Sequence, residues 1–393
     1  MSTRRAFLRD ASLVALAPTV PGFLARAAGA GADPDGRILV VLQLDGGNDG
    51  INTVVPFRDE GYARHRKVLR LPERQLLKIT PEAGLHPEMR DAARLLETGR
   101  LAIVPGVGDP SPSRSHFWGR EVWQSARLDP RDRDGTGWIG RALDGGPPPL
   151  NGAPGAISMG TDAPPAALRG RRSTCTALDR LDDYARVGEP PAPADPADDD
   201  LGAYLRKSAL DAHATADRLE AVARAADAGA SYPDTPLAGR LRLAARLIKA
   251  GLGTRAYYLT QDGYDTHGVQ LPIHGRLLAE LFGATRAFLD DLAAAGLADR
   301  VLVLAFGEFG RRVAENGTAG TDHGTAGLVF LAGPGVVPGL RGPLPSLTDL
   351  VDDDLKTALD FRRVYAILLQ GWLGLPAGPA LGGTFEALPL LKG

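Results

Sequence analysis

The chain has 393 residues, of which 44% are hydrophobic and 23% charged, and its formal net charge is −2. This composition is that of a globular protein with room for one large α/β domain or two ordinary domains, and it favours neither nucleic acid nor an anionic membrane surface as a partner. Cys175 is the only cysteine, so neither an intrachain disulfide nor a thiolate metal cluster can form.

Residues 1–30 have the pattern of a twin-arginine export signal. Arg4 and Arg5 precede a weakly apolar stretch over 11–24, and the small residues over 27–30 suit a signal peptidase. The apolar stretch is too short, and too interrupted by proline, to cross a bilayer. We therefore expect no membrane span in the mature chain.

Export by this route sets expectations about partners and location. Proteins that use it fold before export, often because they take up a metal or cofactor in the cytoplasm. We expect the twin-arginine translocase as a partner during export, and a mature protein over 31–393 that is periplasmic or otherwise exported.

The apolar run Ile38 to Leu44 predicts a strand buried on both faces of a parallel sheet. Asp45 follows it directly, and the next two glycines let the backbone turn away. Ligands of open α/β sheets bind beyond the carboxyl ends of the strands, so Asp45 is a candidate metal ligand or catalytic acid. The alternative is an aspartate that only starts a turn, because Asp-Gly pairs are common turn formers.

Two later strand ends carry further candidates. The strand expected over 254–259 leads to Asp265 and His267, a carboxylate and an imidazole that can both reach one zinc-like ion. A turn without a ligand is the alternative here too. Glu308 follows the strongest apolar run, Arg300 to Phe306.

Asp322 and His323 form a second acid–imidazole pair, between flexible residues and before the apolar run over 328–332. His274 opens a long helix expected to reach about residue 295, and a role at the helix start is favoured over a role as a ligand.

A turn-rich loop joins a buried strand expected over 101–104 to a helix expected over 117–126, and it holds Ser113, Ser115 and His116. A serine at such a position is most often a helix N-cap. A helix N-terminus after a strand is also an anion site, where a serine alkoxide or an oxyanion is stabilised. Both interpretations stay open, with Ser115 preferred over Ser113 as a nucleophile.

We expect one domain over 31–393, with a flexible insertion near 171–200 where periodicity is lost and the sequence is rich in proline and aspartate. Further helices are expected over 60–66, 86–97, 201–226, 237–250 and 360–373, and a further strand over 154–160.

Six motifs occur in order along the chain: LQLDGGNDGINTVVP, PSRSHF, YDTHGVQ, FGEFGR, TDHGTAG and TALDFRRVYAILLQGWLG. With them the sequence resembles a bacterial, twin-arginine-exported family of unassigned function, a domain of unknown function related to the alkaline phosphatase and sulfatase superfamily. The resemblance covers nearly the whole mature chain. It implies a three-layer α/β sandwich with a central, mostly parallel sheet and metal ions at the carboxyl ends of its strands.

The resemblance also implies roles for single residues. Asp45 looks like the first metal-binding aspartate of the superfamily, and Ser113 or Ser115 is similar to its nucleophile. By their positions in the motifs, Asp265, His267, Glu308 and His323 look like further metal ligands. Asp322 is included because it pairs with His323. We expect these acids and histidines to converge around one or two ion-sized spaces.

The chain departs from the superfamily pattern at two points. The usual Asp-His after the strong strand is Glu308-Phe309 here, so one metal site lacks a histidine unless another residue replaces it. Neither serine stands in the sulfatase or phosphatase pattern, and the sulfatase cysteine is absent.

The implied function is that of an exported, metal-dependent hydrolase or transferase of phosphate or sulfate esters with a serine nucleophile. His116, or His267 if it binds no metal, is the expected acid–base partner. The expected metal is zinc, with calcium, magnesium and manganese as alternatives, and the expected substrate is a small-molecule or polymer ester. The alternative is a catalytically silent scaffold that binds an extracellular polymer or a partner protein.

Overall fold

The structure, a computed structural model, describes residues 36–147, 154–160, 163–173, 175–178 and 230–392. The twin-arginine signal, the helix expected over 201–226 and most of the insertion near 171–200 lie outside these residues. The described start of that insertion contains a strand, β7, at the edge of the main sheet.

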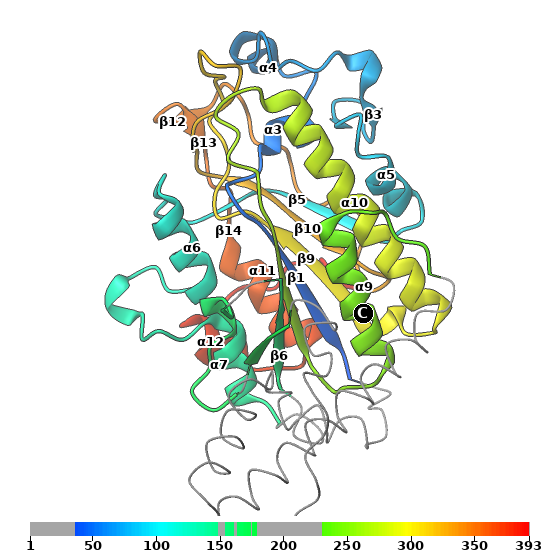
Figure 1. Ribbon diagram of the computed structural model, residues 1–393. Helices are drawn as coiled ribbons and strands as arrows, with labels where there is room; N and C mark the ends of the chain where they lie inside the picture. The colour runs from blue at the N-terminus through cyan, green and yellow to red at the C-terminus, as the bar shows by residue number, and fades with distance from the viewer. Residues whose placement is uncertain (1–35, 148–153, 161–162, 174, 179–229, 393) are drawn as a thin grey trace, which may run out of the picture.

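One large mixed sheet forms the centre of the molecule (Figure 1). Its strands follow the order β11-β5-β10-β9-β1-β8-β6-β7, and β14 also pairs with β5. Every pairing in it is parallel except those of β10, which is antiparallel to both of its neighbours. The strands are β1 (Ile38–Leu44), β5 (Leu101–Gly108), β6 (Ala156–Met159), β7 (Cys175–Leu178), β8 (Ala256–Gln261), β9 (Val301–Phe306), β10 (Gly327–Ala332), β11 (Gly339–Leu340) and β14 (Leu359–Asp360).

Helices cover both faces of this sheet, which makes the three layers that the sequence predicted (Figure 1). On one face lie α5 (Arg90–Glu97), α9 (Pro236–Lys249) and α10 (Gln270–Ala294). On the other lie α6 (His116–Ser125), α7 (Trp138–Gly145), α11 (Phe361–Ile367) and α12 (Ala377–Leu381). Two shorter helices follow β1, namely α3 (Gly50–Thr53) and α4 (Glu60–His65). The predicted α/β fold class is confirmed.

The strand β1 is buried on both faces because its side chains alternate between the two cores. Val40 and Leu42 pack with α9 and α10, whereas Leu39 and Val41 pack with α6, α7 and α11. In register, Gln43 of β1 lies beside Thr260 of β8 and Phe306 of β9. The carboxyl ends of these three parallel strands therefore lie at one edge, and the loops after them carry the candidate acids.

Three elements differ from the sequence-based expectation. The helix expected over 86–97 begins only at Arg90, and the terminal helix expected over 360–373 continues past α11 as a π-helical turn over Leu368–Trp372. The strand expected over 101–104 runs on to Gly108. It passes through Pro105 because the pairing with β10 shifts register there, and such an irregularity tolerates the missing N–H.

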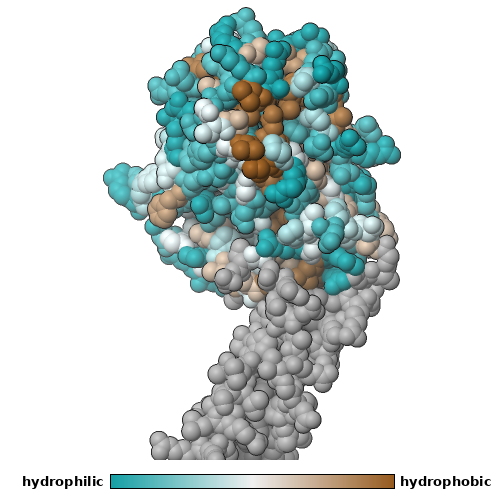
Figure 2. Space-filling view, turned by 45° about the horizontal axis from the view of Figure 1, so that its top comes forward, coloured by the Kyte–Doolittle hydropathy of each residue, from teal (hydrophilic) through white to brown (hydrophobic). Residues whose placement is uncertain are grey.

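The surface is mostly hydrophilic, with hydrophobic residues gathered in the middle of the face shown in Figure 2. Phe117, which follows His116, and Val269, which comes two residues after His267, are exposed by 77% and 66%. None of the helices in the described ranges is both long enough and apolar enough to serve as a membrane span.

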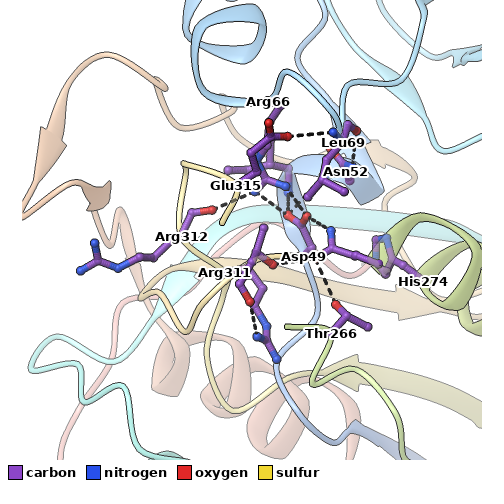
Figure 3. A network of polar contacts seen from close by, with 12 residues as sticks. Asp49, Asn52, Arg66, Leu69, Thr266, His274, Arg311, Arg312 and Glu315 are labelled. Carbon is purple, nitrogen blue, oxygen red and sulfur yellow. Dashed lines mark hydrogen bonds and ion pairs between the residues drawn. The ribbon is translucent and has the colours of Figure 1, made fainter. Parts of the chain in front are cut away.

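Buried polar groups fix the loop that follows β1 (Figure 3). Asp49 Oδ2 lies 2.6 Å from Arg66 Nη1, and neither side chain is exposed. Gln270 of α10 donates to the same carboxylate oxygen at 2.5 Å. Burial alone would raise the pKa of Asp49, but the charge and hydrogen bonds of Arg66 outweigh burial and lower this pKa. Removing one partner of such a buried pair costs about 3–5 kcal/mol, so this loop has little freedom.

His274 lies inside α10, not at its start, and joins the same buried network. Its Nε2 is 2.8 Å from Asn48 Oδ1 and 3.3 Å from Thr53 Oγ1, and its Nδ1 is buried without a hydrogen-bond partner among the described residues. Burial lowers the pKa of His274 to about 3, against the opposing charge of Asp49. The imidazole is therefore neutral in the folded protein.

We expect His274→Gln to flatten the dependence of stability on pH. The pKa of His274 is about 3 in the folded protein and has its ordinary value of 6.5 in the unfolded chain. As the pH falls, the unfolded chain therefore binds a proton at this histidine before the folded protein does. His274 should thus lower the unfolding free energy of the native chain by about 2 kcal/mol between pH 8 and pH 5. Urea unfolding across this range measures the effect, with His65→Gln as a control on a partly exposed histidine. Equal pH dependence in the native chain and His274→Gln would refute it.

Candidate metal centre

Three histidines from separate segments meet at one carboxylate oxygen at the carboxyl edge of the sheet. Asp265 Oδ1 lies 3.4 Å from His116 Nε2, 3.1 Å from His267 Nε2 and 3.0 Å from His323 Nε2. The Nε2 atoms of His267 and His323 are themselves 2.9 Å apart. Asp265 and His267 follow β8, His116 begins α6, and His323 precedes β10.

The second ring nitrogen of each histidine contacts a group that accepts hydrogen bonds. His116 Nδ1 lies 2.8 Å from a carboxylate oxygen of Glu308, and His267 Nδ1 lies 3.0 Å from one of Asp322. His323 Nδ1 lies 2.8 Å from the backbone carbonyl of Arg114. Carbonyl and ionised carboxylate oxygens only accept, so these partners assign the proton of each neutral imidazole to Nδ1. Each Nε2 then presents a lone pair to the carboxylate of Asp265.

Such a convergence of lone pairs fits a cation. Histidine nitrogens with their other N–H held by a carboxylate or a carbonyl are the usual ligands of zinc. The ligand atoms of His116, Asp265 and His323 lie within 4.8 Å of one another. Ligands at about 2.0–2.1 Å from a tetrahedral ion are about 3.3 Å apart, and the contacts of Asp265 Oδ1 with the three Nε2 atoms are 3.0, 3.1 and 3.4 Å long. His116 Nε2 is buried and has no hydrogen-bond partner among the described residues, as expected for a nitrogen that binds a cation.

Arg311 fixes the backbone around Asp265. Its guanidinium is fully buried and donates to Asp265 Oδ1 at 2.6 Å. It also donates to backbone carbonyls of three surrounding loops, namely those of Gly46, Gly47 (2.9 Å), Tyr264 (3.0 Å) and Thr321 (2.7 Å). The loops after β1 and β8 and the loop before β10 are thus held by one side chain.

The carboxyl group of Asp265 is ionised at neutral pH. Burial acts to raise its pKa, but the hydrogen bond from Arg311 and the charge of Arg311 prevail and lower the pKa to about 2. Its side chain is 47% exposed, so the cluster is open to solvent and to a ligand.

Glu308 orients His116 and lies beside Asp45. One carboxylate oxygen of Glu308 accepts from His116 Nδ1 and, at 3.0 Å, from the backbone N–H of Gly46; the other is buried without a hydrogen-bond partner among the described residues. The hydrogen bond to Glu308 raises the pKa of His116. Burial, and next the charge of Glu308, raise the pKa of Asp45, while Arg120 at 3.4 Å opposes this rise. A shared proton or a further cation between Asp45 and Glu308 would relieve the repulsion between their two carboxylates.

The two serines lie on either side of Arg114, whose backbone carbonyl contacts His323 in the cluster. Ser115 is the N-cap of α6, and its hydroxyl oxygen accepts from the backbone N–H of Trp118 at 3.5 Å. The hydroxyl oxygen of Ser113 accepts from the backbone N–H of Ser115 at 3.3 Å. Arg114, between them, supplies the carbonyl that receives His323 Nδ1. Ser115 therefore caps the helix, Ser113 stabilises the turn before it, and Arg114 between them contacts the cluster.

Sequence reasoning assigned His116 an acid–base role, which stays a prediction; in the structure its Nε2 lies 3.4 Å from Asp265 and its Nδ1 lies 2.8 Å from Glu308. The structural role of Arg311 had no local signal, because an arginine in a glycine-rich loop usually faces solvent. Asp45, Asp265, His267, Glu308, Asp322 and His323 do gather at one edge of the sheet, although Glu308 and Asp322 contact histidines and not the shared oxygen.

A family described as "Protein of unknown function (DUF1501)" matches residues 106–358. The match spans more than half of the chain, so the chain belongs to this family. The predicted membership in a family of unassigned function is confirmed. Among curated proteins, none matches the sequence.

Solved structures similar to this chain include a sulfatase, a periplasmic domain in complex with Zn and a protein of the alkaline phosphatase superfamily. The PsFucS1 sulfatase from Pseudoalteromonas sp. is 9% identical, with a TM-score of 0.41 over 100% of this chain and 77% of that chain. The C-terminal periplasmic domain of EcEptC from Escherichia coli, in complex with Zn, is 10% identical, with a TM-score of 0.39 over 88% and 85%. A protein of the alkaline phosphatase superfamily from Vibrio parahaemolyticus is 10% identical, with a TM-score of 0.38 over 92% and 76%. Similarity this distant carries no argument about activity.

The loss of a group that hydrogen-bonds to a metal ligand typically lowers metal affinity roughly 10–100-fold. We expect His116→Ala to weaken zinc binding by more than this range and Glu308→Gln to weaken it within the range. The first change removes a lone pair from the cluster, and the second removes the charged acceptor of His116 Nδ1. Zinc competition titrations measure both, with His65→Ala as control. Unchanged affinity in His116→Ala would mean that this imidazole binds no cation.

Proposed function

We propose that the protein is an exported, metal-dependent hydrolase or transferase of phosphate or sulfate esters. Its proposed metal ligands are His116, Asp265, His267 and His323. The single observation that carries this proposal is the convergence of three Nε2 atoms on one carboxylate oxygen while each Nδ1 contacts an acceptor.

The donor set fits a zinc-like ion better than the alternative cations. Calcium, magnesium and manganese prefer oxygen ligands, whereas imidazole nitrogens with one carboxylate suit zinc. When bound, such an ion supplies a Lewis acid that polarises an ester oxygen. The carboxylate of Asp265 is kept ionised by Arg311 and is ready to bind it.

Cationic groups around the cluster suit an anionic ester. The side chains of Arg114 and Arg120 are 42% and 45% exposed, and Arg120 lies 3.4 Å from Asp45. The ten-residue helix α6 starts at His116, so its free N–H groups and its dipole add positive potential beside the ligands. Phosphate and sulfate groups are the anions that such a site orients.

Ser115 is the proposed nucleophile, with Ser113 as the alternative. The hydroxyl oxygen would bond to phosphorus or sulfur as the bond to the leaving alcohol breaks, and water or a second alcohol would then release the enzyme. Asp45, which lies beside Glu308 and 3.4 Å from Arg120, is the proposed acid–base carboxyl group. His116 is assigned to the metal in this proposal, which replaces the acid–base role expected from the sequence.

One observation favours the second candidate, a silent scaffold that binds an ester-bearing polymer. Both serine hydroxyls already accept hydrogen bonds from nearby backbone N–H groups, as serines do that only cap a helix. The two candidates share the metal site and differ in turnover.

The test compares Ser115→Ala and Ser113→Ala with Ser346→Ala, a serine that accepts from backbone N–H groups in a turn elsewhere. Zinc-loaded protein is assayed with an aryl phosphate, an aryl phosphodiester and an aryl sulfate, and each variant is melted. Losing a cap costs about 1 kcal/mol, so we expect Ser115→Ala to fold and bind zinc but to lose turnover.

Full activity in both Ser115→Ala and Ser113→Ala would exclude the serine mechanism. Zinc binding by the native protein without turnover of any ester in the panel would support the scaffold instead.

A further inference from the structure

His323 is held by a loop that a distant hairpin anchors. Its Nδ1 contacts the backbone carbonyl of Arg114 at 2.8 Å. The side chain of Arg114 reaches Asp354 Oδ2, with Nε at 2.9 Å and Nη2 at 2.6 Å. Asp354 begins β13 (Asp354–Leu355), which pairs with β12 (Leu350–Val351). A chain of contacts therefore runs from the hairpin, through Arg114, to the imidazole.

The hydrogen bonds that the side chain of Asp354 accepts within the described residues come from Arg114. Its side chain is 1% exposed, whereas that of Arg114 is 42% exposed. Its Oδ1 is buried without a hydrogen-bond partner among the described residues, and Arg312 Nε is 3.9 Å from that oxygen. A buried carboxylate with a single two-pronged partner is costly to keep, so this pairing holds the position of Arg114 firmly.

The hairpin itself is built to present these groups. Asp352 and Asp353 both have positive φ, 52° and 63°, which a two-residue turn between β12 and β13 requires. Arg114 Nη2 lies 3.4 Å from the carbonyl oxygen of Asp352, so the turn offers a second acceptor to the same guanidinium. Aspartate is among the residues other than glycine that adopt such backbone angles most readily, so the sequence suits this turn.

We propose that Asp354 is a positioning residue for the metal centre: through Arg114 it holds the carbonyl that accepts His323 Nδ1–H, and it thereby keeps the Nε2 lone pair of His323 directed at Asp265. The proposal rests on the proposed function only in that a cation is expected there. The loss of a group that orients a ligand typically lowers metal affinity about 10–100-fold, and that is the effect assigned to Asp354.

The test uses the full chain and zinc alone as the probe, in a competition titration against a chromogenic chelator. Asp354→Asn and Arg114→Ala should each weaken zinc binding about 10–100-fold. The double variant should be no weaker than the worse single one, because both changes break the same chain of contacts. Asp349→Asn is the matched control, since Asp349 is a nearby exposed acid that pairs with Lys356.

A second measurement does not need the metal. Nitrogen NMR of the histidine side chains in metal-free protein should show His323 with its proton on Nδ1 in the native chain and in Asp349→Asn. In Asp354→Asn and Arg114→Ala the two tautomers should mix. If either single variant fails to fold, the double variant carries the test, because it leaves no unpaired charge buried at position 354 and the backbone carbonyl of residue 114 remains.

Native zinc affinity or an unchanged His323 tautomer in these variants would overturn the positioning role, as would additive losses in the double variant. Absence of zinc binding in the native protein would instead contradict the proposed function, and the tautomer measurement would still decide the role of Asp354.

Discussion

The site depends on one buried guanidinium. Arg311 donates to Asp265 and to backbone carbonyls in the loops that follow β1 and β8 and precede β10. Carbonyls bring no formal charge, so the positive charge of Arg311 remains available to the carboxylate of Asp265 and keeps it ionised. Because these loops come from distant parts of the sequence, no local interaction could set their spacing. The guanidinium therefore both shapes the cluster and fixes its charge.

A second buried arginine holds the same region from the other side. Arg66 pairs with Asp49, and Gln270 and His274 of α10 complete the network behind the loop after β1 (Figure 3). The loop between β1 and α3 is thus fixed by Arg311 through its carbonyls and by Arg66 through a carboxylate. Sites held within fractions of an ångström need such support around the groups that bind. This rigidity suits a preformed metal centre more than one assembled by a moving loop.

The sequence predicted the parts of the fold that depend on local pattern. The apolar runs of β1, β8 and β9 are buried strands, and their carboxyl ends meet because all three are parallel. What it missed depends on contacts across the fold. Pro105 led to the prediction that the strand ends there. In the structure β5 continues, because the register of its pairing with β10 shifts at this point and tolerates the missing N–H of the proline. The place of His116 beside Ser115 was visible in the sequence, whereas its contact with Glu308, 192 positions away, was not.

His116, His267 and His323 are proposed to share one cation with Asp265. X-ray absorption at the zinc edge of the purified, zinc-loaded protein counts the histidine ligands, because imidazole rings give a characteristic scattering pattern. We expect nitrogen and oxygen ligands at about 2.0–2.1 Å, with three imidazoles in the native protein and two in His116→Ala. A shell of oxygen ligands without imidazole, or a protein that retains no zinc, would contradict this proposal.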